Sequence, residues 1–207
     1  MSTFLAPPGA GTPRPARQAE AGVLAELLAE AFFNDPLTRW ITPDDHRRAQ
    51  LLPGMFQVFL DMSFAHDGVL TNSGQDAVLT FFPPGAWERL EEHGEAYDRR
   101  FAEVLGADAE RLDTISRLQA AHHPVDQPHY YLAFGAVRGT AQGAGRISAL
   151  VAEVVARADA QEVGVYGEAS SPGGEAAARR FGCRPAGPEI VLPGDGPSLR
   201  PLWRDPR

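Results

Sequence analysis

The segment at residues 138–146, called here the glycine loop, has a composition suited to holding an anion. It begins and ends with arginine and contains Gly143 and Gly145. Glycine lacks a Cβ, so its amide can approach a ligand closely and its backbone can adopt a positive φ. We expect the loop to open into a helix, whose first N–H groups and positive dipole end attract an anion. A pyrophosphate would suit this loop, although a glycine turn before a helix is as often only a turn.

Two other kinds of phosphate loop do not fit this segment. A dinucleotide-binding loop has the spacing G-x-G-x-x-G after the first strand of its domain, whereas the glycine loop lies late in the chain and lacks the third glycine. A P-loop ends in Gly-Lys-Ser or Gly-Lys-Thr, and the chain contains no lysine. The same absence excludes Schiff-base chemistry.

Glu168 is the residue best placed to act as a general base. It ends residues 162–168, an expected strand, and ligand clefts of open α/β sheets lie at such strand ends. Partial burial there would raise the pKa of the carboxyl toward neutrality, as a base requires. The competing interpretation is a surface or structural glutamate. His129, at the start of an expected strand over 129–137, is a second candidate base, and a structural histidine is the commoner interpretation.

The other candidates for covalent or metal chemistry are weak. Cys183 is the single cysteine, which excludes an intrachain disulfide and a zinc site built from cysteines. We interpret it as a small buried hydrophobe at the start of a strand. The six histidines show no metal-ligand spacing, so we expect no metal.

The spacing of apolar residues predicts the elements that would position these side chains. The expected helices cover 17–33, 46–62, 147–158 and 174–181, with two more inside 86–121 that break near Gly106. The expected strands cover 68–72 and 76–82, which form a hairpin, and 129–137, 162–168 and 189–192. This alternation predicts an α/β fold. We expect residues 1–15, rich in Pro, Gly and Ala, to form a flexible arm and 16–207 to form one domain.

Bulk composition is that of an ordinary soluble protein. The chain of 207 residues is 43% hydrophobic and 22% charged, which suits one folded domain. Its net charge of −8 provides no field to attract nucleic acid or an anionic membrane. The N-terminus lacks the basic and apolar regions of a signal peptide, and no apolar run is long enough to span a membrane. We therefore expect a cytoplasmic protein with neither nucleic acid nor membrane as partner.

Several ordered segments resemble those of the GNAT superfamily of acetyltransferases. V-R-G-T-A-Q-G-A-G-R-I-S-A-L at 137–150 is similar to the acetyl-CoA loop of that family. E-A-S-S-P at 168–172, followed by R-F-G, is similar to its E-A-S-x-P … R-x-G-F segment. A-F-F-N-D-P at 31–36, F-P-P-G at 82–85 and H-Y-Y-L at 129–132 lie at matching places. The pattern is most similar to members resembling puromycin N-acetyltransferase.

The resemblance implies a GNAT fold, with a mixed, strongly bent central sheet flanked by helices on both faces. It implies direct transfer of an acetyl group from acetyl-CoA to the amine of a small molecule, antibiotic-like or natural-product-like. We expect the protein to be a monomer or homodimer. Glu168 matches the position of the general base. The residues expected to bind acetyl-CoA are Ala136, Val137, Arg138, Gln142, Gly143, Ala144, Gly145, Arg146, Ile147 and Ser148. Those expected to contact the acceptor are Asp35, Trp40, Tyr131 and Ser170.

Three positions depart from the family pattern. Ile147, a β-branched residue that tolerates a positive φ poorly, replaces a third loop glycine, and Gly174 replaces an asparagine. Ala178 replaces the tyrosine that protonates the departing thiolate. Loss of a general acid costs about 10²–10⁴-fold in rate, and Arg179 or Arg180 is a candidate substitute. Two alternatives stay open: an enzyme performing cyclisation or elimination without acyl-CoA, and a non-catalytic small-molecule-binding protein.

Overall fold

The structure, a computed structural model, describes residues 11–207. Its helices are α1 (Ala21–Phe32), α2 (Pro36–Ile41), α3 (Asp45–Phe64), α4 (Ala86–Glu92), α5 (Gly94–Leu105), α6 (Ala109–His122), α7 (Arg146–Ala160) and α8 (Pro172–Arg180). Its strands are β1 (Arg14–Pro15), β2 (Val69–Thr71), β3 (Ala77–Phe82), β4 (His129–Val137), β5 (Gly164–Ala169), β6 (Arg184–Pro185), β7 (Ile190–Val191) and β8 (Ser198–Arg204). No helix in the described part of the chain is long and apolar enough to cross a membrane.

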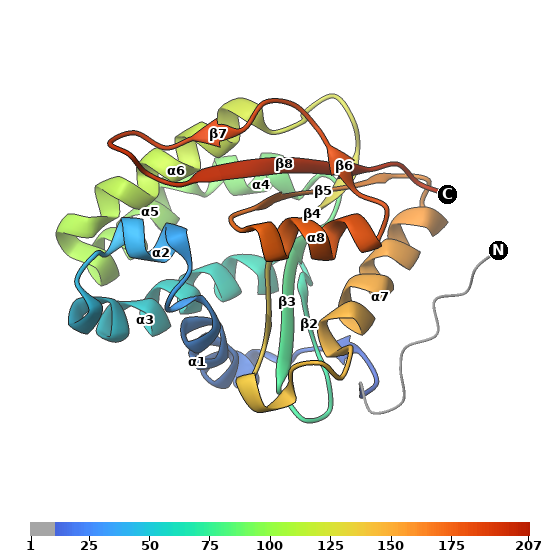
Figure 1. Cartoon of the computed structure of the whole chain (residues 1–207), viewed down its shortest axis with the longest axis horizontal. Coiled ribbons are helices and arrows are strands. Elements are labelled where there is room, and N and C mark those ends of the chain that lie inside the picture. Colours follow the sequence, from blue (N-terminus) through green and yellow to red (C-terminus); the bar gives the residue numbers. More distant parts are fainter. Residues whose placement is uncertain (1–10) are drawn as a thin grey trace.

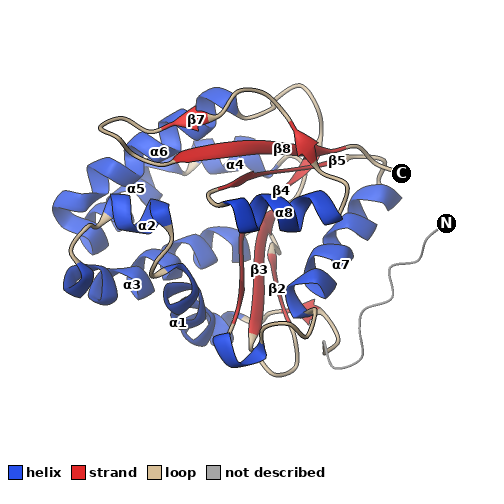
Figure 2. Ribbon diagram, viewed as in Figure 1, coloured by secondary structure: helices blue, strands red, loops and turns tan. Residues whose placement is uncertain are grey.

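The strands form one mixed, open sheet of eight strands (Figure 2). Its order is β1-β2-β3-β4-β5-β8-β6, and β7 pairs with β8 off that path. The β4–β5 pair is parallel, and the other pairs are antiparallel. A parallel pair needs a crossover connection, and α7 supplies it along one side of the sheet (Figure 1).

Helices cover both faces of the sheet and form two apolar cores. On one face α1 and α3 pack against β3, and α5 and α6 extend this layer, around a core that includes Leu28, Phe56 and Ile115. On the other face α7 packs on β3, β4 and β5 through Leu150 and Val154, which lie four residues apart on one side of the helix. Every residue of β3 is buried, as in a strand covered on both faces. The expected α/β fold, with a mixed sheet between helices, is confirmed.

A buried arginine fixes the connection from α1 through α2 to α3. Arg48 of α3 is 1% exposed, and its Nε donates to the carbonyl of Phe33 at 2.8 Å. Its Nη1 donates to the carbonyls of Thr42 and Pro43 at 2.8 and 3.1 Å, and Asp45 accepts from Nη2 at 2.5 Å. A buried charge is costly unless it is paired in this way. Arg48 therefore holds α2 in place beside the end of α1.

The sequence does not predict β8, the strand between β5 and β6. Its segment Ser198–Arg204 contains a proline and two arginines, which suggest an exposed and irregular segment. In the fold Arg204 is 3% exposed and pairs with Asp159 at 2.7 and 2.8 Å. Arg200 pairs with Glu175 of α8 at 2.5 Å. The carboxylates that neutralise both arginines are distant in sequence, so no local sequence pattern predicts these ion pairs.

Several other boundaries differ from the expected ones. Residues 86–121 form three α-helices instead of two, although Gly106, with φ of 57°, does separate the second from the third as expected. The helix expected at 174–181 begins at Pro172, because Ser171 caps it and proline suits the first turn. The strand expected at 189–192 shortens to two residues in β7.

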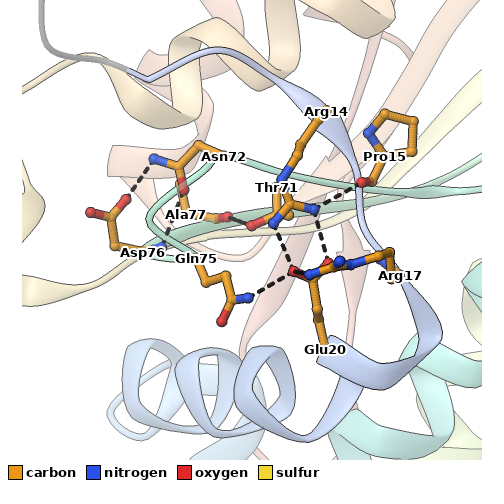
Figure 3. A network of polar contacts seen from close by, with 9 residues as sticks. All are labelled: Arg14, Pro15, Arg17, Glu20, Thr71, Asn72, Gln75, Asp76 and Ala77. Atoms are coloured by element: carbon orange, nitrogen blue, oxygen red, sulfur yellow. Dashed lines mark hydrogen bonds and ion pairs between the residues drawn. The ribbon is translucent and has the colours of Figure 1, made fainter.

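Part of the expected N-terminal arm belongs to the sheet. Residues 1–10 lie outside the described residues, but Arg14 and Pro15 pair with Thr71 and Leu70 of β2. Glu20, 4% exposed, holds this strand by accepting hydrogen bonds from both terminal nitrogens of Arg14 at 2.7 and 2.9 Å (Figure 3). The ordered domain thus begins earlier than position 16.

Candidate active site

The parallel strands β4 and β5 pair over only half the length of β4. Their register runs from His129 opposite Gly164 to Leu132 opposite Gly167. Beyond Leu132, β4 continues to Val137 beside β3, whereas β5 remains paired with β8. Residues 133–137 therefore have no β5 partner on that side. An extended ligand can pair with such an edge as an added strand does.

A β-bulge lies where this separation begins. Phe81 of β3 pairs with Leu132, whereas the preceding Thr80 pairs with Phe134, so Ala133 is an extra residue on β4. The Thr80 hydroxyl accepts a hydrogen bond from the Phe134 amide at 3.0 Å and thereby fixes the irregular register. Bulges bend a strand and increase its local twist. The bulge therefore gives a local reason for the two strands to separate.

Glu168 follows the last β4–β5 pair by one residue. Gln119 of α6 donates its Nε2 to Glu168 Oε2 at 3.4 Å. The Oε1 atom is buried and has no hydrogen-bond partner among residues 11–207. Burial raises the pKa of this carboxyl, and the hydroxyls of Tyr131 and Tyr166 oppose the rise by favouring the charged form. Glu168 as a whole is half-buried, and its carboxyl end is the buried part, with a raised pKa and one unused oxygen.

Tyr131 and Tyr166 lie opposite each other on β4 and β5, on the sheet face that carries Glu168. Their ring centroids are 5.9 Å apart. Burial, and then the nearby charge of Glu168, raise the pKa of both hydroxyls, which remain protonated at neutral pH. The Tyr166 hydroxyl is buried without a hydrogen-bond partner among the described residues. Both phenols can therefore donate hydrogen bonds beside the carboxyl.

His129 is buried, and both of its ring nitrogens are already engaged. Its Nδ1 lies 2.7 Å from the carbonyl oxygen of Gln127, which only accepts, so this nitrogen carries the proton. Its Nε2 lies 3.2 Å from Nε2 of His123 and accepts from it. Burial, followed by the charge of His129, lowers the pKa of His123 to about 4, and burial also lowers the pKa of His129. Both rings are neutral at neutral pH, an arrangement that does not favour His129 as the base.

Three residues of this environment were not expected from the sequence: Gln119, His123 and Tyr166. His123 stacks on Trp87 of α4 with ring centroids 3.7 Å apart. Tyr166 precedes Glu168 by two residues on a strand, so the period of two places both on one face. That signal could have identified Tyr166. Gln119 and His123 reach the site from the end of α6, and no short motif connects them to it.

The glycine loop has the backbone conformation expected of it. Gly143 and Gly145 have positive φ angles of 83° and 69°, and α7 begins at the next residue, Arg146. No side chain among the described residues caps this helix, and its first turn contains no acidic residue. The amides of the first turn, which includes Ile147 and Ser148, are therefore suited to an anion.

Ile147 causes none of the backbone strain expected from its replacing a glycine. It lies inside α7 and is absent from the residues with positive φ. Its side chain points to the sheet, where a Cβ on Gly135 would lie 3.0 Å from its Cδ1 atom. The glycine in β4 thus leaves room for isoleucine in α7, and the amide of Ile147 stays at the helix N-terminus.

Both arginines of the glycine loop are paired with carboxylates. Arg146 binds Asp76 in the turn between β2 and β3, and Nη1 of Arg138 lies 3.3 Å from Glu30 of α1. The other expected acetyl-CoA residues lie on the loop or the β4 edge: Gln142 is exposed, Ala144 is half-buried, and Ala136 and Val137 belong to the part of β4 that lacks β5.

The expected acceptor residues divide into two groups. Asp35 accepts hydrogen bonds from the Leu37 amide at 2.9 Å and from the Ser170 hydroxyl at 2.7 Å, so this pair ties α2 to the end of β5. Ser170 follows Glu168 by two residues along the chain. Tyr131 lies on the neighbouring strand, opposite Tyr166, on the face that carries Glu168. Trp40 lies elsewhere, against Arg111 of α6, whose Nη1 donates to its carbonyl at 2.6 Å.

The remaining candidates lie on or near α8. Ala178 is half-buried there, and Arg179 donates from Nε and Nη2 to Glu175 at 3.0 and 2.7 Å. Arg180 is exposed. Burial raises the pKa of Cys183, which makes its thiolate unfavourable. No group of three His, Cys, Asp or Glu residues within 11–207 is arranged to hold a metal ion.

Two surface cavities border α6. One, of about 410 Å³, is lined by Tyr166, Trp203 and residues of the segment after α6. The other, of about 430 Å³, is lined by residues of α6 and of the β7 region. Glu168 lines neither of them. Tyr166 therefore borders both the buried carboxyl and a space that is open to solvent.

No family model and no curated protein sequence matches the chain. Solved structures do match it. A protein from Corynebacterium glutamicum described as histone acetyltransferase HPA2 and related acetyltransferase is 28% identical, with a TM-score of 0.69 and 98% of each chain covered. Arylalkylamine N-acetyltransferase 2 from Aedes aegypti is 14% identical, with a TM-score of 0.68, and 93% of this chain and 97% of that one are covered. The polyamine N-acetyltransferase of Drosophila melanogaster is 16% identical, with a TM-score of 0.58 and coverages of 94% and 99%.

These likenesses extend over almost the whole chain and almost the whole of each neighbour. The fold is that of the GNAT acetyltransferases, as the segment resemblance implies. The neighbour at 28% identity supports an enzyme of the N-acyltransferase type, and the other two show the fold.

Proposed function

We propose that the protein transfers an acetyl group from acetyl-CoA to the amine of a small molecule, with Glu168 as the general base. The observation that carries this proposal is the location of a buried carboxyl with an unused oxygen at the point where β4 and β5 separate. A base must lie where donor and acceptor meet. Here the free edge of β4 and the face bearing Glu168 adjoin.

The backbone features support binding of acetyl-CoA as acyl donor. The pantetheine arm would pair with Ala136 and Val137 on the free edge, and the pyrophosphate would lie on the first-turn amides of α7. That turn has neither an acidic residue nor a side-chain cap to compete with the anion. When bound, acetyl-CoA supplies the thioester carbonyl that the amine attacks.

Glu168 supports the proton transfer that the attack requires. An amine must lose a proton as it forms an amide, and a carboxyl with a raised pKa matches that task near neutral pH better than an exposed one. Gln119 donates to the carboxyl, and the hydroxyls of Tyr131 and Tyr166 lie near it and stay protonated themselves. Since Ala178 cannot protonate the departing thiolate and Arg179 is engaged by Glu175, Arg180 remains the candidate on α8 to stabilise it.

The aromatic residues near Glu168 support the proposed class of acceptor. The rings of Tyr131 and Tyr166 lie on the face that carries Glu168, and the ring of Trp87 lies 6.3 Å from that of Tyr131, centroid to centroid. Such rings favour an amine with an apolar or aromatic part and also attract a cation. An antibiotic-like or natural-product-like amine, and a monomer or homodimer as the working unit, stay predictions.

The deciding experiment pairs calorimetry with an acetylation assay. Purified wild-type protein should bind acetyl-CoA in the micromolar range and acetylate at least one amine of a panel of arylalkylamines, polyamines and aminoglycoside-like compounds. Gly145→Glu, which adds a negative charge at the proposed pyrophosphate site, should abolish binding, and Glu168→Gln should keep binding and lose turnover. Absence of binding at millimolar acetyl-CoA would reject the proposal and direct attention to chemistry that does not use acyl-CoA.

A further inference from the structure

We infer that Asp76, in the turn between β2 and β3, is a positioning residue that orders the glycine loop for the pyrophosphate; the inference rests on the proposed use of acetyl-CoA. Asp76 belongs neither to the loop nor to the resemblance segments. Its importance follows from the two contacts that it makes with the loop.

Asp76 holds both ends of the glycine loop. Its carbonyl oxygen accepts a hydrogen bond from the amide of Arg138, the first loop residue, at 2.8 Å. Its carboxylate accepts from the guanidinium of Arg146, the last loop residue and the first of α7. One residue thereby fixes the separation of the two positions between which the chain must turn.

The glycine loop needs support from outside itself, and we call the two contacts of Asp76 with Arg138 and Arg146 the clamp. Gly143 and Gly145 adopt positive φ, and glycine has more backbone freedom to lose than any other residue. Gly143 and Gln142 are exposed, so little packing restrains them. Ordering the loop only when a ligand binds would subtract from affinity. A clamp that orders the loop beforehand avoids that loss.

Asp76 is itself held firmly (Figure 3). Its Oδ1 accepts from Asn72 Nδ2 at 2.7 Å, and its amide donates to Asn72 Oδ1 at 3.2 Å. The adjacent Gln75 adopts a φ of 52° and donates its Nε2 to Glu20 Oε1 at 2.7 Å. Since Glu20 is buried and bound to Arg14, the turn is anchored to the N-terminal strand. The clamp thus has a rigid base.

The pairing also decides which groups face the phosphate. The guanidinium of Arg146 is largely neutralised by Asp76, and both side chains are half-buried at 23% and 22% exposure. Arg146 therefore orients the helix N-terminus, and the amides do the binding. The alternative is that the Asp76 carboxylate competes with the pyrophosphate for the Arg146 guanidinium. Removing the carboxylate would then tighten acetyl-CoA binding.

The test compares two acyl donors and one matched control variant. Asp76→Ala should weaken acetyl-CoA binding about tenfold, or ~1.4 kcal/mol, in calorimetry, and Asp76→Glu should restore most of it. The kcat/KM for S-acetyl-pantetheine, which lacks the pyrophosphate, should stay unchanged. Asp61→Ala is the control, because Asp61 is 23% exposed and also binds an arginine, Arg100, but lies on α3. It should leave acetyl-CoA affinity unchanged.

Amide hydrogen exchange gives a readout that needs no ligand. Residues 139–148 should exchange faster in Asp76→Ala than in wild type, and Asp61→Ala should not change them. Unchanged exchange there, equal losses for both acyl donors, or tighter acetyl-CoA binding in Asp76→Ala would overturn the inference. Wild-type protein that does not bind acetyl-CoA would reject the proposed function. Faster exchange in Asp76→Ala would still show, in that case, that Asp76 orders the glycine loop.

Discussion

The candidate site has two proposed halves, one for the acyl donor and one for the acceptor, and they are built by opposite means. The donor half, made of residues 133–137 and the glycine loop, offers mainly backbone groups: a free strand edge and the amides of a helix N-terminus. The acceptor half is built from side chains, namely Glu168, Tyr131, Tyr166 and Gln119, which come from β4, β5 and α6. The donor half can be recognised in a short stretch of sequence because its proposed function depends on local backbone conformation. The acceptor half depends on tertiary contacts.

The largest effect should come from Glu168→Gln, which tests whether the acceptor half carries the chemistry. We expect kcat to fall about 10³-fold, within the range for loss of a general base, with acetyl-CoA affinity unchanged because the donor half is intact. Steady-state kinetics with an acetylated amine and calorimetry with acetyl-CoA measure the two quantities. Glu162→Gln, at an exposed glutamate before the same strand, is the control. Equal kcat in both variants would remove Glu168 from the mechanism.

Gly145→Ala tests whether the donor half acts through its backbone. A side chain at φ of 69° is strained by about 1–2 kcal/mol, so we expect acetyl-CoA affinity to fall about tenfold and kcat at saturation to change little. Gly106→Ala also places a side chain at positive φ, 57°, between α5 and α6, and its ψ of −125° makes the backbone strain larger there than at Gly145. It should lower stability without changing acetyl-CoA affinity. A similar affinity loss in both variants would point to general unfolding as the cause.

Tyr166→Phe should change the acceptor half alone, through the pKa of Glu168. The Tyr166 hydroxyl lowers that pKa, so its removal should raise the pKa further and move the acid limb of the kcat/KM profile to higher pH. We expect turnover at the optimum to change by less than about tenfold, since the carboxyl remains. Tyr130→Phe is the matched control, because Tyr130 is also buried but faces α7 and bonds Gln161. A profile that shifts equally in both variants would contradict the assignment.

Glu20→Gln should give the smallest functional effect. Arg14, chiefly through its hydrogen bonds, holds the pKa of Glu20 well below its usual range. A carboxyl with a lowered folded-state pKa contributes stability above its unfolded pKa, and that contribution is lost as pH falls toward the folded value. The variant should therefore lose about 2 kcal/mol at pH 7 in urea unfolding, and the difference from wild type should narrow below about pH 4.5. Acetyl-CoA affinity should fall only about twofold; a constant stability difference at all pH values would refute the explanation.

The sequence predicts the donor half better than the acceptor half, for physical reasons. In the proposed function Gly143, Gly145 and the helix after them act through local conformation, and the positive φ angles and the helix start expected there are present. Ile147 was misjudged because its compensation, Gly135, lies on another element. Glu168 followed from a motif, but the orientation of His129 toward His123 and the stacking of His123 on Trp87 depend on how α4 and α6 pack. Those contacts exist only after the chain has folded.

The extra residue at Ala133 also sets the orientation of every side chain after it. Before the bulge, odd-numbered Tyr131 shares its face with Phe82 and lies beside Glu168. After it, even-numbered Phe134 and Ala136 join the core on that same face. The bulge therefore changes which residues of β4 face this core: odd-numbered residues before it and even-numbered residues after it. Deleting Ala133 would restore a regular ladder with the same pairs, Phe81 with Leu132 and Thr80 with Phe134, so Phe134 and Ala136 would keep their face. The bend and extra twist of the bulge would be lost, and with them the local reason for β4 and β5 to separate.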